Sequence, residues 1–265
     1  MKEYIIRGGP AGRERLRLLS RAMAPFTGAL FDDAGIANGM RVLDIGCGGG
    51  DVTQELGRRV GPTGRVLGMD MDAVEIEIAR KEAAAVGASN VEYRAGNVLS
   101  DAIGEEFDTV YARFLLSHLA APEQGISKMI ACLKPGGLVI VEDVDFSGHF
   151  CRPERQSFTD YVRWYEQSAR RRGVDCQIGP RLPAMLADTG LKVLGARAVN
   201  PAAIDGPVKQ MGAATLAAIA DSVVKEGLAT RDTVEATLAD LIVATEDPRV
   251  FMSMPRIVQC WARAG

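Results

Sequence analysis

The residues best suited to chemistry lie close together at positions 41–50, which read Arg-Val-Leu-Asp-Ile-Gly-Cys-Gly-Gly-Gly. Residues 42–45 are typical of a short buried strand, in which Asp44 places a carboxylate just before the end. The glycines that follow allow a tight turn and a close approach to a ligand, and a helix is predicted over 53–60. A strand, an acid, a glycine turn and a helix together predict a cradle for a nucleotide-like cofactor.

The spacing of the glycines limits which cofactor this turn can hold. A dinucleotide fingerprint, Gly-x-Gly-x-x-Gly, fails because its third glycine would fall on Asp51 or Thr53. A triphosphate loop needs a Gly-Lys-Ser/Thr sequence, and the turn contains no lysine. The pattern that fits is Asp-x-Gly-x-Gly-x-Gly, formed by Asp44, Gly46, Gly48 and Gly50.

The turn is embedded in a series of strands that alternate with helices. Further strands are expected at 66–69, 91–95, 107–111, 138–141 and 191–199, and helices at 13–34, 72–86, 122–133, 154–172, 182–189, 207–226 and 231–245. A last strand at 250–262 is interrupted by Pro255, which predicts an edge position or a bulge. Alternation at this short spacing predicts an α/β fold with an open, doubly wound, mostly parallel sheet.

Four motifs, in this order, resemble those of class I S-adenosylmethionine-dependent methyltransferases of the small-molecule type. They are the glycine turn, Asp70 at the end of the second strand, Gly96-Asn97-Val98 after the third, and Leu-Lys-Pro-Gly-Gly at 133–137 before the fifth. The resemblance implies a Rossmann-like methyltransferase fold, with a seven-stranded sheet, N-terminal helices and an inserted helical cap. It also implies S-adenosyl-L-methionine as the cofactor and a small-molecule methyl acceptor.

The acids near the glycine turn are assigned different roles. Asp44 is expected near the methionine end of the cofactor, or else as a brace for the turn. Asp70 can accept hydrogen bonds from both ribose hydroxyls, with Met71 beside the adenine. Asp72 is the rival ribose ligand, but its spacing to Glu75 predicts a helix cap. Free backbone N–H groups at the start of the helix that follows the glycine turn suit the cofactor's carboxylate.

The other cofactor positions follow from the resemblance. Asn97 stands where the family often has an acid, and its amide can still bond the adenine, while Val98 offers a backbone N–H. Arg113 ends the fourth strand, where the family contacts the methionine part, and Tyr4 belongs to a leader that closes over the cofactor. The full expected cofactor set is Tyr4, Asp44, Gly46, Gly48, Gly50, Asp70, Met71, Asn97, Val98 and Arg113.

Two catalytic candidates lie near the ends of the later strands. His118 follows the fourth strand, where ligands sit in such sheets, and can take a proton from an acceptor. The alternative is a histidine that only bonds nearby backbone. Asp143, at the end of the fifth strand, is a second candidate base, or else a carboxylate that structures its loop.

Residues of the predicted cap are candidates for binding the acceptor. On the helix at 154–172, Phe158, Tyr161 and Tyr165 share one face. Core packing is the alternative role for these aromatic side chains. The expected substrate set is His149, Tyr161, Trp164 and Tyr165.

Composition narrows the class of protein. The chain has 265 residues, 47% of them hydrophobic, and a net charge of −3, which gives no reason to expect nucleic acid as a partner. Its five scattered cysteines form no Cys-x-x-Cys pair, which predicts a reducing compartment and no metal site. No signal peptide or membrane-spanning stretch is found, so a cytoplasmic location and no membrane partner are expected. A homodimer is compatible with these numbers.

The expected organisation is a single domain in three parts: an N-terminal helical lid at 1–40, a cofactor-binding half of the core at 41–145, and the rest of the core with cap insertions at 146–265. Methyl transfer would be an in-line displacement, in which positioning and exclusion of water do most of the catalysis. The alternatives are an S-adenosylmethionine-binding protein without methyl transfer, a nucleic-acid methyltransferase and a nicotinamide dehydrogenase. The missing third glycine argues against the last.

Overall fold

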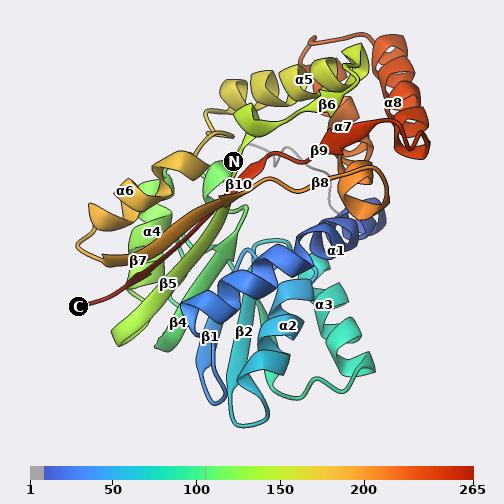
Figure 1. The fold of residues 1–265 in the computed structure, drawn as a ribbon. Helices are drawn as coiled ribbons and strands as arrows, with labels where there is room; N and C mark the ends of the chain where they lie inside the picture. Colours follow the sequence, from blue (N-terminus) through green and yellow to red (C-terminus); the bar gives the residue numbers. More distant parts are fainter. Residues whose placement is uncertain (1–8, 105) are drawn as a thin grey trace.

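The structure is a computed structural model that describes residues 9–104 and 106–265. Its centre is a seven-stranded sheet of order β3-β2-β1-β4-β5-β10-β7 (Figure 1). The strands are β1 (Arg41–Ile45), β2 (Arg65–Asp70), β3 (Val91–Ala95), β4 (Phe107–Arg113), β5 (Leu133–Asp145), β7 (Lys192–Val199) and β10 (Arg256–Arg263). The first five are parallel, and β10 runs antiparallel between β5 and β7. The predicted doubly wound, mostly parallel, seven-stranded sheet is confirmed.

Helices cover both faces of this sheet (Figure 1). One face carries α1 (Gly9–Ala34), α2 (Asp51–Val60) and α3 (Ala73–Ala85), and the other carries α4 (Pro122–Ile130) and α6 (Leu182–Ala187). The alternation of side chains along β1 explains why both faces are apolar. Val42 packs with residues of α1 and α2, whereas Leu43 and Ile45 pack with residues of α4 and α6.

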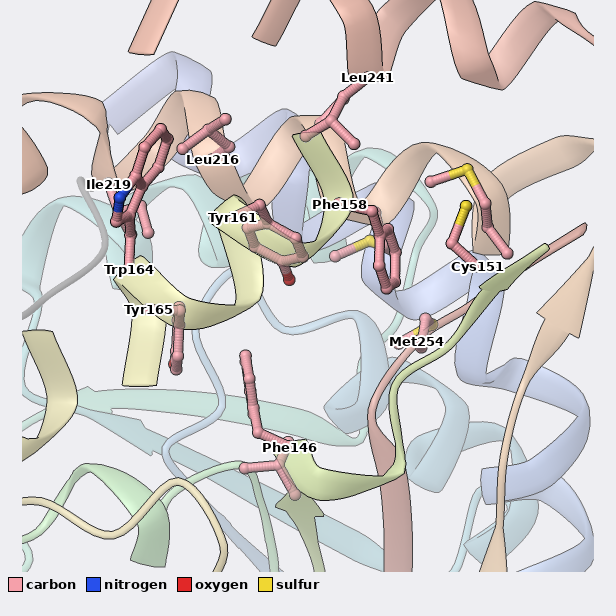
Figure 2. Packing of buried hydrophobic residues seen from close by; sticks show 14 of the residues in the cluster. Phe146, Cys151, Phe158, Tyr161, Trp164, Tyr165, Leu216, Ile219, Leu241 and Met254 are labelled. Atoms are coloured by element: carbon pink, nitrogen blue, oxygen red, sulfur yellow. The ribbon is translucent and has the colours of Figure 1, made fainter. Parts of the chain in front are cut away.

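Three more helices and a small sheet stand over the carboxyl ends of the parallel strands and form what we call the roof (Figure 1). The helices are α5 (Gln156–Arg172), α7 (Gly206–Lys225) and α8 (Arg231–Glu246), and the small sheet joins β6 (Cys151–Arg152), β9 (Phe251–Ser253) and β8 (Ala202–Ala203). Large apolar side chains fill the interior of the roof, among them Phe158, Trp164, Leu216, Ile219 and Leu241 (Figure 2). The roof also packs against α1, and its helix α7 makes this contact.

Two of the boundaries that differ from the sequence prediction change how the chain is read. The helix expected at 122–133 ends at Ile130, because β5 already begins at Leu133 and continues to Asp145. The strand expected at 250–262 is two strands, β9 in the roof and β10 in the main sheet. Pro255 therefore lies in the break between two sheets and not at an edge or a bulge. This break carries the chain past the ends of the parallel strands.

Short 3-10 helices shape the connections at this end of the sheet: η1 (Leu116–His118), η2 (Phe146–Gly148) and η3 (Gly179–Arg181). Each of the first two directly follows one of the central strands, β4 or β5. Within the described part of the chain, no helix has both the length and the apolar character needed to cross a bilayer.

Candidate active site

A cavity of about 650 Å³ lies between the roof and the carboxyl ends of the parallel strands. This volume falls within the range of small-molecule sites, which is roughly 300–1,000 Å³. The cavity opens where the strand order reverses between β1 and β4, the usual ligand position in open α/β sheets. Its walls come from the loops after β1, β2 and β3, from α1 and the end of β4, and from the roof with η1 and η2.

The glycine turn after β1 lies on the first side. Gly46, Gly48 and Gly50 have φ values of 73°, 50° and 80°, which glycine adopts far more readily than other residues. At Gly50 a Cβ would also lie 2.5 Å from the hydroxyl of Tyr93. The sequence pattern of the turn is thus explained by backbone conformation and close packing.

The amides of this turn are mostly used to hold its own shape. The N–H groups of Gly46 and Cys47 donate to the carbonyl of Met69, and the N–H of Gly50 donates to Cys47. The N–H of Gly48 donates to Asp70. The amides of the glycine turn are therefore engaged, and the start of α2, where the sequence predicts free amides, stays the predicted position for the cofactor's carboxylate.

Asp44 is the most buried acid of the cavity wall, with 2% of its surface exposed. Its Oδ2 accepts a hydrogen bond of 2.7 Å from the Thr53 hydroxyl. Burial raises the pKa of Asp44 to about 6, although the Thr53 hydrogen bond and the positive charge of Arg113 oppose the rise. A carboxylate in this position favours a cationic group of a ligand.

Asp70 is oriented by backbone at the end of β2. Its Oδ2 accepts from the Gly48 N–H and its Oδ1 from the Asp72 N–H, each at 2.9 Å. Burial raises the pKa of Asp70 above its ordinary value, although these hydrogen bonds act to lower it. Since each carboxylate oxygen can accept more than one hydrogen bond, Asp70 can still receive a pair of hydroxyls.

Asp72 is a helix cap, as predicted. Its side chain accepts from the N–H groups of Val74 and Glu75 at the start of α3. Met71, between the two acids, is 60% exposed and lines the cavity. Asp72 is thus engaged in capping α3, and Asp70 stays the predicted ribose ligand of the two acids.

The side-chain oxygen of Asn97 takes part in a local turn, because Oδ1 accepts from the Leu99 N–H at 2.9 Å. Asn97 lines the cavity, so the contact of its amide with an adenine stays a prediction. Val98 is buried and lines the cavity beside it. Tyr4 lies outside the described residues.

Arg113 lies on the floor of the cavity at the end of β4, and its Nη1 donates to the Thr27 hydroxyl at 3.3 Å. Beneath it lies a buried polar network that sequence reasoning missed. The fully buried Glu142 accepts from the hydroxyls of Thr27 (2.9 Å) and Tyr111 (2.5 Å), and from the amide of Gln259 (2.5 Å). The sequence does contain one indication of this network, which is an acid within the apolar run of β5. A buried carboxylate requires hydrogen-bond donors around it.

Both histidines line the cavity on its roof side. Burial lowers the pKa of His118 to about 4, with a further contribution from the charge of Arg15. Burial also lowers the pKa of His149 to about 4, so both rings are neutral near pH 7. Nδ1 of His149 lies 3.0 Å from the carbonyl oxygen of Phe146. Because a carbonyl only accepts, this contact assigns the proton to Nδ1 and leaves Nε2 able to accept one.

Aromatic side chains form the remaining wall. Tyr161 and Tyr165 of α5 line the cavity, and the ring of Tyr165 stacks on Phe146 with centroids 4.1 Å apart (Figure 2). His149 meets Tyr161 edge to face at 6.0 Å. The thioethers of Met211 and Met254 belong to the same region, which sequence reasoning did not single out.

Two side chains predicted for this site lie elsewhere, and Gly50 of the glycine turn is likewise not part of the cavity wall. Asp143 is 1% exposed, is not part of the cavity wall, and accepts from the N–H groups of Ser117 and Val144. It braces η1, which is the alternative that the sequence left open. Trp164 is 2% exposed and packs inside the roof, near Ile219 (Figure 2). Neither side chain is carried into the site.

The sheet order, the glycine turn and the two acids after β1 and β2 define a class of α/β proteins that bind a nucleoside cofactor. Within that class, residues 36–172 match a family model described as a methyltransferase domain. This match spans just over half of the chain, and the chain belongs to that family. Its cofactor is S-adenosylmethionine.

Curated relatives match over part of their length. A ubiquinone biosynthesis O-methyltransferase of Chelativorans sp. is 39% identical over 109 residues, which cover 40% of this chain and 41% of the relative. A ubiquinone/menaquinone biosynthesis C-methyltransferase of Klebsiella pneumoniae is 31% identical over 132 residues, covering 49% of this chain and 52% of the relative. The chain spans about half the length, or less, of these curated relatives.

Solved structures share the fold. Coclaurine N-methyltransferase bound to N-methylheliamine and S-adenosylhomocysteine has a TM-score of 0.58 at 17% identity, covering 90% of this chain and 71% of its own. The [4+2]-cyclase SpnF has a TM-score of 0.57 at 20% identity, covering 91% of this chain and 80% of its own.

The cavity residues fit the family's cofactor. Asp70 is held by two amides and can still accept from the two hydroxyls of a ribose. Asp44 offers a negative charge on the same side of the cavity, which suits the ammonium or sulfonium of the cofactor.

Proposed function

We propose that the protein transfers a methyl group from S-adenosylmethionine to a small-molecule acceptor bound between the cofactor and the roof. The observation that carries the proposal is Asp70, whose carboxylate is oriented by the glycine turn at the wall of the cavity. The family match and the size of the cavity support it, because a cofactor and a small acceptor must share the space.

The bound cofactor supplies a methyl group that is already activated by its sulfonium. The chain's own residues then have mainly to orient and enclose the reactants. Asp44 and Asp70 hold the cofactor from the side of β1 and β2, with the Arg113 side chain on the floor. The roof excludes water above the acceptor.

His149 is the side chain best placed to receive a proton from the acceptor. Its Nδ1 proton is engaged with Phe146, so Nε2 carries the lone pair. When the nucleophile is a hydroxyl or amine, its proton passes to Nε2 as the new bond to carbon forms. His118, also neutral and in the cavity wall, is a second group able to accept it.

The acceptor itself is proposed to be aromatic. Phe146, Tyr161 and Tyr165 form a wall suited to stacking against a planar ring. Two relatives are named for ubiquinone biosynthesis, which agrees with an aromatic acceptor. The proposed nucleophile is a hydroxyl or an amine, because a base such as His149 is useful only where a proton must leave.

Titration calorimetry with S-adenosylhomocysteine tests the cofactor site. Asp70→Ala should weaken binding at least about tenfold, because hydrogen bonds to a charged group contribute roughly 1.5–3 kcal/mol each. Asp72→Ser is the matched control, since serine keeps the helix cap without the charge. Equal affinities of Asp70→Ala and the unaltered protein would contradict the ribose assignment.

A second candidate is a protein that binds the cofactor but transfers no methyl group. The observation that favours it is the shared fold with a protein named as a [4+2]-cyclase. Mass spectrometry of a panel of phenols and anilines incubated with S-adenosylmethionine separates the two. Products heavier by one methylene support methyl transfer, and firm cofactor binding with no such product supports the second candidate.

We also propose that the protein works in the cytoplasm without nucleic acid, as a monomer or a homodimer. Its five cysteines are free thiols, as a reducing compartment requires. The net charge of −3 offers no attraction to phosphate backbones. Light scattering after size-exclusion chromatography measures the oligomeric state directly.

A further inference from the structure

We propose that the acceptor carries a carboxylate and that Arg15 binds it beneath the roof. This inference deepens the methyl-transfer function proposed above and rests on it. Acidic side chains gather on one side of the cavity. The acidic side chains of the wall are Asp44, Asp51, Asp70, Asp72 and Glu75. All of them come from β1, α2, the end of β2 and the start of α3, the side assigned to the cofactor. Two arginines line the same cavity: Arg113 at the end of β4, and Arg15 of α1, which lies against Thr215 of the roof helix α7.

Arg15 is a cation without a partner of opposite charge among the described residues. It lies on α1, is half-buried, and lines the cavity. Its Nη2 is 3.4 Å from the Thr215 hydroxyl of α7, and its Nε is buried with no hydrogen-bond partner. On the same helix, Arg13 pairs with Asp51 and Arg17 with Glu82. A guanidinium with an idle buried donor fits a ligand that brings its own negative charge.

The neighbours of Arg15 suit a carboxylate. The hydroxyl of Tyr161 points from α5 toward Phe146 (Figure 2). Tyr161 lines the cavity, as Arg15 does. Burial raises the pKa of Tyr161 to about 12, although the charge of Arg15 acts to lower it, so the phenol keeps its proton and can donate. The charge of Arg15 also acts on His118, which places the guanidinium among these groups.

The cofactor's own carboxylate is the rival partner, and the packing of α1 argues against it. Leu16 faces the glycine turn, where it comes within 3.1 Å of a Cβ built on Gly48. Arg15, one position earlier and about 100° around the helix, reaches α7 instead. The cofactor side has a cation of its own, Arg113, whose charge acts on Asp44. The acceptor is therefore the better source of the carboxylate.

The test measures binding, so it does not depend on turnover. The probes are benzoate, phenylacetate, 3-phenylpropanoate and cinnamate, each paired with its neutral amide and titrated into the protein saturated with S-adenosylhomocysteine. At least one acid should bind about tenfold or more tightly than its amide. In Arg15→Gln the preference should fall to about twofold or less, while the affinity for S-adenosylhomocysteine stays unchanged. The matched control is Arg21→Gln, an exposed arginine of α1 that pairs with Glu14 and should keep the preference.

Three results would overturn the inference: no acid binds better than its amide, the preference survives in Arg15→Gln, or Arg15→Gln weakens S-adenosylhomocysteine as much as it weakens the acids. The last result would assign Arg15 to the cofactor's tail. A failure of the proposed function looks different. In that case the unaltered protein would not bind S-adenosylhomocysteine, or would methylate no acceptor, whatever the ratio of acid to amide.

Discussion

Replacing Asp44 with asparagine should stabilise the ligand-free protein while weakening its hold on the cofactor. The carboxylate is 2% exposed, and its pKa is raised from 3.8 to about 6 mainly by burial. A folded-state pKa above the unfolded value means that the native protein binds this proton more tightly. The contribution of Asp44 to stability is therefore fully present below about pH 4 and is lost as the pH rises through about 6.

The size of the effect follows from the shift. Because one pKa unit corresponds to about 1.4 kcal/mol, the ionised Asp44 lowers the free energy of unfolding at about pH 8 by roughly 3 kcal/mol. The amide of the Asp44→Asn variant keeps an oxygen that can accept from Thr53 and carries no charge. Urea unfolding at about pH 8 should thus show Asp44→Asn more stable by up to about 3 kcal/mol, with the difference shrinking toward zero near pH 4. Its affinity for S-adenosylmethionine should fall, since an attraction for the cationic groups is lost.

Asp108→Asn is a control of opposite sign. Burial acts to raise the pKa of Asp108, but hydrogen bonds from the Arg41 amide and Lys134 outweigh it and leave the pKa lowered. A lowered pKa contributes stability above the unfolded value, so this variant should be less stable than the unaltered protein at about pH 8. An Asp44→Asn protein that is destabilised at pH 8, or whose difference from the unaltered protein is the same at both pH values, would refute the reasoning.

Three further variants test other parts of the site. Gly50→Ala should lower the free energy of unfolding by at least about 2 kcal/mol, because φ is 80° and the new Cβ meets Tyr93. The control is Gly87→Ala, with φ of 67° and open space around it, whose free energy of unfolding should fall less in the same urea titration. His149→Gln should lower kcat for a hydroxyl acceptor by about a hundredfold or more. Because the pKa of His149 is about 4, kcat of the unaltered protein should not fall between about pH 8 and pH 5, and an acid limb near 6.5 that the variant abolishes would contradict this. Lys209→Met should lower the free energy of unfolding by about 2–3 kcal/mol, since the buried ammonium donates to the backbone carbonyls of Ile204, shortly before α7, and Asp247, directly after α8. An unchanged urea midpoint would contradict this.

The cofactor side of the cavity could be predicted from the sequence because its residues follow directly on strands. Asp44 and Asp70 each occupy the end of a parallel strand, and such ends meet at one edge of the sheet. The turn between them is defined by glycine spacing, which is a local property. The local bond of Asn97 was not predicted: its oxygen accepts from an amide only two residues away, a preference of asparagine that competes with ligand binding.

The roof side could be predicted only in outline, because its contacts join distant parts of the chain. Arg15 and Thr215 are 200 residues apart, and Glu142 and Gln259 are 117 apart. No local pattern connects such pairs. The same limit explains Trp164 and Tyr161: both are aromatic residues of one helix, but only the tertiary packing decides which of them reaches the cavity.

The place of β10 sets the order in which the molecule can be assembled. This strand lies between β5 and β7 although it follows both in the chain, and β7 pairs with no other strand of the described sheet. During synthesis, the hydrogen-bonding edge of β5 therefore stays open until residues 256–263 have left the ribosome. An exposed apolar strand edge invites pairing with other chains. A chain that ends near residue 250 lacks β10 and should therefore aggregate. It should not form a folded main sheet that lacks only part of the roof.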